Sequence, residues 1–129
     1  MPLPTQRPTY DRSYSIYAAS LAAAASPAVA VIGRGRVIDI RFVPLVAPTT
    51  TQTVITPSVN AVQMQLNGSN AALAIPAGAS ANAVAASLQP NGRNVVDLGD
   101  VVTLASDAGA ANAASVPGYY TVTVRETSQ

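Results

Sequence analysis

The sequence predicts an all-β protein, an antiparallel β-sandwich that carries an extended N-terminal arm. Short stretches in which apolar and polar residues alternate recur along most of the 129-residue chain, and a period of two is typical of strands with one buried face. Gly, Asn, Asp and Pro turns separate these stretches, and no long segment has the periodicity of a helix. We therefore expect an arm with a short Ala-rich helical turn over residues 1–28, and one sandwich domain over residues 29–129.

The arm is predicted from its prolines and alanines. Pro2, Pro4 and Pro8 restrict the backbone to extended conformations. Residues 18–25, AASLAAAA, favour a helical turn but are too few to be stable alone. We expect such a segment to become ordered by docking on a partner, because ordering costs about 1–2 kcal/mol per residue.

Tyrosine and arginine dominate the energetics of protein interfaces, and both are frequent in the arm. The predicted partner-binding residues are Arg7, Tyr10, Arg12, Tyr14, Tyr17 and Leu21. The alternative is that these side chains fold back on the chain's own sandwich.

The strands of the sandwich are predicted from alternation. Asn67-Gly68 is expected to close a hairpin, and residues 80–89 are compatible with a turn or a helix. The expected inward-facing residues are Ile38, Ile40, Phe42, Val62, Met64, Leu66, Leu73, Ile75, Val102, Leu104, Tyr120, Val122 and Val124.

The composition argues against catalysis. The chain has no His, Cys or Lys, so its Ser and Thr residues have no obvious activating base, and we expect neither an enzyme nor a cofactor. Asp97, Asp100 and Asp107 fit ordinary turns better than a calcium site, although an ion there stays open. The sequence GRGR at residues 33–36 lacks the strand–loop–helix context of a phosphate loop, which favours a hinge or an edge bulge.

The charge balance points to an assembled protein. The net charge is +1, which predicts no attraction to nucleic acid. The chain has no run of about 18 apolar residues, so we expect no membrane span. Only 10% of the residues are charged, against about 25% in a typical soluble domain. A low-charge surface is expected of a subunit that packs against others.

Three segments carry a resemblance to a known family. LNGSNAALAIPAGASANAV, LGDVVTLASDAG and YYTVTVRE resemble segments of small virion proteins of tailed bacteriophages, of the capsid decoration, cement or head-fibre type. The resemblance covers roughly residues 29–126. It departs at Asn82, where the family motif has a second glycine, and at Ala108.

The resemblance implies a jelly-roll-like sandwich that binds and stabilises a capsid without catalysis. Its implied partners are the major capsid protein and neighbouring copies of itself, as a dimer or trimer. The implied location is the virion, assembled in the bacterial host cytoplasm. The alternative is a carbohydrate-binding or adhesive sandwich of a tail or surface structure, which the lack of Trp makes less favourable.

Overall fold

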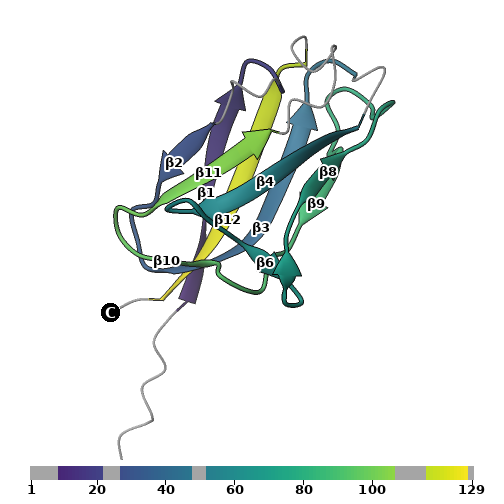
Figure 1. The fold of residues 1–129 in the computed structure, drawn as a ribbon. Helices are drawn as coiled ribbons and strands as arrows, with labels where there is room; N and C mark the ends of the chain where they lie inside the picture. The colour runs from purple at the N-terminus through teal and green to yellow at the C-terminus, as the bar shows by residue number, and fades with distance from the viewer. Residues whose placement is uncertain (1–8, 22–26, 48–51, 107–115, 128–129) are drawn as a thin grey trace, which may run out of the picture.

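The computed structural model describes residues 9–21, 27–47, 52–106 and 116–127, and all regular elements in these residues are β-strands (Figure 1). Two antiparallel sheets pack face to face, so the predicted all-β antiparallel sandwich is confirmed. Sheet A contains β1 (Thr9–Ala18), β12 (Gly118–Thr127), β3 (Gly35–Pro44), β9 (Ala86–Leu88) and β10 (Val95–Val96). Sheet B contains β2 (Ala28–Ala30), β11 (Val101–Ser106), β4 (Thr53–Val59), β5 (Val62–Gln63) and β8 (Leu73–Ile75). A small hairpin joins β6 (Gln65–Leu66) to β7 (Ser69–Asn70).

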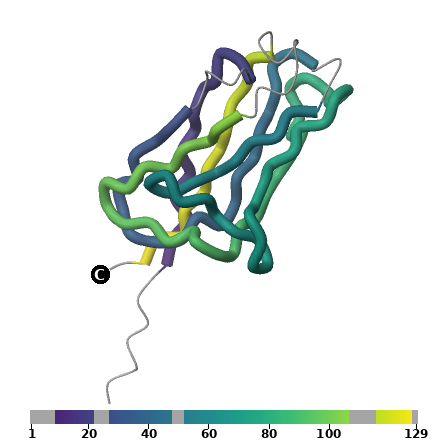
Figure 2. The backbone as a smooth tube through the Cα atoms, in the orientation of Figure 1, coloured from purple at the N-terminus to yellow at the C-terminus, as the bar shows by residue number. Residues whose placement is uncertain are grey.

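Neighbouring strands in each sheet are mostly distant in sequence. Sheet A runs β1-β12-β3-β10, with β9 paired to another part of β3. Sheet B runs β2-β11-β4-β5, with β8 paired to β4. The start of β1 and the end of β12 lie side by side at one end of the molecule (Figure 2).

The predicted arm is wrong for residues 9–18, because these residues form the edge strand β1 of sheet A. β1 pairs with β12 along its whole length, from Thr9 opposite Thr127 to Ala18 opposite Gly118. Pro2, Pro4 and Pro8 all precede the strand and therefore do not interrupt its ladder. The described half of the predicted helical turn, residues 18–21, is not helical, and its other half, together with residues 1–8, lies outside the described residues.

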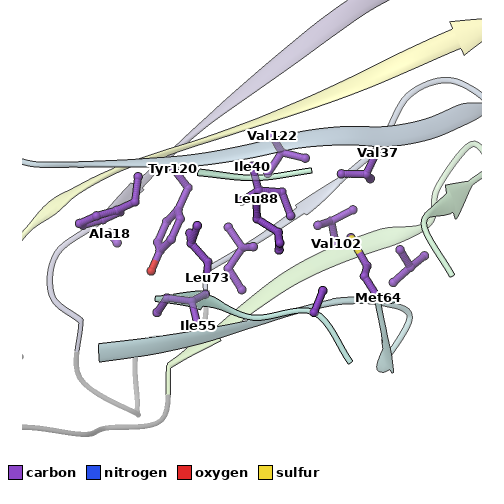
Figure 3. Close-up of a cluster of buried hydrophobic side chains, with 14 of the residues drawn as sticks. Ala18, Val37, Ile40, Ile55, Met64, Leu73, Leu88, Val102, Tyr120 and Val122 are labelled. Carbon is purple, nitrogen blue, oxygen red and sulfur yellow. The ribbon is translucent and has the colours of Figure 1, made fainter. Parts of the chain in front are cut away.

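The core lies between the two sheets (Figure 3). Tyr120 of β12 and Phe42 of β3 are its largest side chains, and their ring centroids are 4.8 Å apart. Most of the predicted inward-facing residues are buried there, which confirms the alternation of the last two long strands in particular. The exceptions are Ile38, Val62 and Leu66.

A β-bulge explains why Ile38 is not part of the core. Asp39 lies opposite Thr123 and Val37 lies opposite Val124, so β3 has one extra residue between two consecutive positions of β12. The extra residue is Ile38, and it shifts the alternation by one. Val37 is therefore fully buried instead.

The predicted hairpin at Asn67-Gly68 is confirmed. Both residues have positive φ values, 52° and 82°, as a two-residue type I′ turn requires. The strand that enters the turn is interrupted, however, because Val62 belongs to β5 and Leu66 to the separate β6–β7 hairpin. Of this stretch, Met64 is buried, and its backbone N–H donates to the Pro57 carbonyl at 3.0 Å.

Residues 80–89 contain no helix and instead form turns followed by β9. Ala85 donates its backbone N–H to the Phe42 carbonyl at 2.9 Å, which brings the segment to the edge of β3. No part of the described chain forms a helix with the length and hydropathy needed to cross a membrane.

Candidate functional site

The two sheets differ sharply in charge. Within the described strands, every charged side chain belongs to β1, β3 or β12 of sheet A. The strands of sheet B carry no charge, and their outward positions are Ala, Val, Ser, Thr and Gln. The molecule therefore presents one charged face and one neutral face of mostly short side chains.

A row of charged residues crosses the outer face of sheet A near one end. Asp11 lies opposite Arg125, which in turn lies opposite Arg36. Arg125 donates to both carboxylate oxygens of Asp11, at 2.9 and 3.2 Å. This hydrogen-bonded pair lowers the pKa of Asp11 and raises the pKa of Arg125.

The same end of the sheet holds a hollow of about 400 Å³, here called the arginine pocket. Three of its lining residues are arginines and none is acidic. The lining residues are Thr9, Arg34, Gly35, Arg36, Ile38, Val95, Arg125 and Thr127. Arg34 reaches the pocket from the loop before β3 and also contacts Asp97, at 3.3 and 3.4 Å.

A shallow groove of about 500 Å³ lies beside the arginine pocket on the same face, and Ile38 lines both hollows. Asp39 lies in this groove and accepts hydrogen bonds from Arg41 Nε at 2.7 Å and Gln89 Nε2 at 2.6 Å. The groove is lined by Asp11, Ser13, Ile38, Asp39, Arg41, Gln89, Thr121 and Thr123. The bulge at Ile38 places an apolar side chain between the two polar hollows.

A tyrosine pair lies on the outer face near the other end of sheet A. Tyr17 and Tyr119 are opposite each other in the β1–β12 ladder, with ring centroids 5.3 Å apart and planes tilted by 59°. Tyr17 is 55% exposed and Tyr119 is 44% exposed. The pair offers an accessible aromatic surface.

Three of the predicted partner-binding residues serve their own domain instead. Arg12 Nε donates to the buried Glu126 carboxylate at 2.7 Å. The Tyr14 hydroxyl accepts the backbone N–H of Ile32 at 3.0 Å, and Leu21 is buried in the core. For these residues the alternative prediction, that they fold back on their own sandwich, is correct.

The remaining partner-binding candidates stay open. Tyr10 is 49% exposed at the start of β1 and, like Tyr17, is available at the surface. Arg7 lies outside the described residues. The period-two pattern of β1, with Tyr10, Tyr14 and Ile16 on one side, is the sequence signal that identifies this segment as a strand.

The GRGR sequence has a packing role that the sequence analysis missed. A side chain at Gly33 would come within 2.6 Å of the Glu126 carboxylate, and one at Gly35 would overlap the Arg125 carbonyl oxygen. The two glycines let the loop and the start of β3 lie directly against β12. Residues 33–36 thus form a close backbone contact in place of the predicted hinge or edge bulge. The bulge of β3 lies further on, at Ile38.

Asp97 and Asp100 form the predicted turn. The Asp100 carboxylate accepts the Asp97 backbone N–H at 2.8 Å, and Gly99 has a φ of 87°. The Leu98 backbone N–H and then Arg34 lower the pKa of Asp97. Asp107 lies outside the described residues, within which no three acidic, His or Cys side chains cluster as metal ligands.

The outer face of sheet A is equipped for noncovalent binding. It offers charged and hydroxyl groups in two adjoining hollows, with an aromatic pair near the far end. No family model, curated protein or solved structure matches the chain. Its function is therefore inferred from the sequence motifs and from the two contrasting faces.

Proposed function

We propose that the protein is a non-enzymatic structural protein of a bacteriophage virion, which binds and stabilises the capsid as a decoration or cement protein. The observation that carries this proposal is the segregation of charge between the two sheets. A neutral face of mostly short side chains packs closely against another protein without desolvating charges. The charged face keeps the opposite side of the subunit hydrated.

The strand order supports the jelly-roll part of the proposal. Leaving out β5, β6, β7 and β10, eight strands remain. Counted along the chain, sheet A then has the order first, eighth, third and sixth, which is β1-β12-β3-β9. Sheet B has the order second, seventh, fourth and fifth, which is β2-β11-β4-β8. This order supports a jelly roll, an architecture of eight strands in two sheets that is found in viral capsid and lectin domains. The motifs that resemble phage virion proteins fall on β6–β8, β11 and β12.

The proposed partners are the major capsid protein and neighbouring copies of this chain, and the proposed location is the virion. We assign the capsid contact to the outer face of sheet B, which includes Thr56 and Ala105, opposite each other in the β4–β11 ladder. We assign Tyr10 and Tyr17 to the contacts between neighbouring copies, because exposed tyrosines are favoured at interfaces.

A single charge on each face tests the capsid contact. Thr56→Arg places a guanidinium on the neutral face, and Thr121→Arg places the same group on the charged face as a control. We expect Thr56→Arg to abolish co-sedimentation with capsids that lack the protein, whereas Thr121→Arg co-sediments like the wild type. Equal co-sedimentation of both variants would contradict the proposed face, and no binding by the wild type would contradict the proposed function.

The second candidate function is that of a carbohydrate-binding or adhesive sandwich. The observation that favours it is the groove on sheet A, in which Asp39, Gln89 and Thr121 present hydrogen-bonding groups along a shallow surface. The exposed Tyr17–Tyr119 pair adds an aromatic surface on the same face. A glycan array tests this candidate: binding that Asp39→Ala abolishes would support it, and an array without bound glycans would contradict it.

A further inference from the structure

Two arginines face each other in the arginine pocket. Arg36 of β3 and Arg125 of β12 are direct cross-strand neighbours on the outer face of sheet A. Like charges in this position repel each other. Asp11 compensates Arg125 from the other side, but within the described residues no carboxylate contacts Arg36, which has Val95 as its other cross-strand neighbour. Among the residues that the structure describes, the Arg36 guanidinium in this pocket thus has no counter-ion.

The positive charge around the pocket suits a ligand that carries one negative charge. Arg34 and Arg125 each have one exposed carboxylate partner, Asp97 and Asp11, neither of which lines the pocket. Arg36 leaves an excess of one positive charge. A guanidinium binds a planar carboxylate through two parallel hydrogen bonds, and a carboxylate carries a single charge at neutral pH.

We infer that the arginine pocket binds the carboxylate of an acidic saccharide, whose neighbouring sugar rings lie in the adjoining groove. The pocket holds about 400 Å³, more room than a carboxylate alone needs, and Thr9 and Thr127 line it together with the arginines. Ile38 and Val95 provide an apolar surface for the face of a sugar ring. The inference rests on the second candidate function, because it assigns the groove to a saccharide.

The groove favours a saccharide over an acidic peptide. Its polar side chains are held by their own contacts, such as Gln89 to Asp39 and Ser13 to Thr123, at 2.6 and 3.1 Å. Fixed amide, carboxylate and hydroxyl groups in a shallow groove are suited to the many hydroxyls of a sugar chain. An extended peptide would instead seek unpaired backbone groups at a strand edge.

The test uses an oligosaccharide in which glucuronate alternates with N-acetylglucosamine, and the same oligosaccharide with its carboxylates reduced to alcohols. Binding to the full chain is measured by calorimetry and by NMR shifts of isotope-labelled protein. We expect the acidic form to bind at least about tenfold more tightly than the reduced form. We also expect Arg36→Gln to remove this difference, whereas Arg93→Gln, on an exposed loop outside the pocket, retains it.

A second variant tests the pocket while Arg36 is kept. Val95→Glu places a carboxylate opposite Arg36, where it supplies the missing counter-ion. We expect this variant to be as stable as the wild type and to lose the preference for the acidic oligosaccharide.

Each contrary outcome has a distinct meaning. Equal binding of the acidic and reduced forms would overturn the carboxylate pocket and leave the saccharide groove standing. No binding of either form would overturn both. Equally tight binding of a tetraglutamate peptide would overturn the assignment to a saccharide. Capsid co-sedimentation is measured on the other face, so it is independent of these results.

Discussion

Glu126 shows how a single charged residue constrains its neighbours. Its side chain is 3% exposed, and it is the one acidic residue among the buried side chains of the described chain. Arg12 supplies its counter-ion from β1, and Gly33 leaves room for its carboxylate. A buried carboxylate without a partner is strongly destabilising, so these contacts depend on one another.

Removal of Arg12 and removal of Arg125 should therefore have unequal effects on stability. Arg12→Met leaves the Glu126 carboxylate buried without its partner, whereas Arg125→Met breaks an exposed pair with Asp11. We expect the melting temperature to fall much further for Arg12→Met, as measured by calorimetry. We expect the double variant Arg12→Met/Glu126→Gln to recover part of the melting temperature that Arg12→Met loses. Equal losses for the two single variants would contradict the structural role of Glu126.

The individual strands show which structure the sequence determines locally. β12 and β11 alternate without interruption, and Asn67-Gly68 favours its turn by backbone conformation alone, so these elements are predicted correctly. The bulge at Ile38 depends on how β3 pairs with β12, which no local pattern reveals. The arginine pocket was not predicted for the same reason, since its residues come together only through the pairing of β1, β12 and β3.

The sequence predicts an arm where β1 forms, because Pro2, Pro4 and Pro8 directly precede the alternating residues of this strand. It contributes a ten-residue ladder to sheet A, and Leu21 fills part of the core. We expect deletion of residues 1–8 to leave a folded protein, and deletion of residues 1–21 to unfold it, as judged by circular dichroism. Trypsin should cut slowly after Arg12 in the free protein. Rapid cleavage there would contradict the pairing of β1 with β12.

The charges of the whole molecule predict how its stability depends on pH. The pKa values of Asp11 and Asp97 are lowered in the folded state, so their contributions are present above about pH 4 and are lost as the pH falls further. Burial raises the pKa of Tyr120, so its contribution is present below about pH 10 and is lost as the pH rises. The chain has no His or Cys side chain that would titrate between these limits.

The free energy of unfolding should thus be nearly constant from about pH 5 to 9 and should decrease on both sides. Chemical denaturation at a series of pH values measures it. Asp11→Asn should flatten the acid side of this profile and leave the alkaline side unchanged. A stability step near pH 6 to 7 would contradict the expectation.

The adjacency of β1 and β12 has a consequence for the order in which the protein is made. β12 lies between β1 and β3, so sheet A lacks an inner strand until residues 118–127 have left the ribosome. The strands of sheet B, by contrast, have all been synthesised by Ser106. A nascent chain would therefore hold β1 unpaired, with its Tyr and Ile side chains accessible to chaperones, during nearly the whole of translation. Folding should end in one late step, in which β12 inserts between β1 and β3, both synthesised earlier.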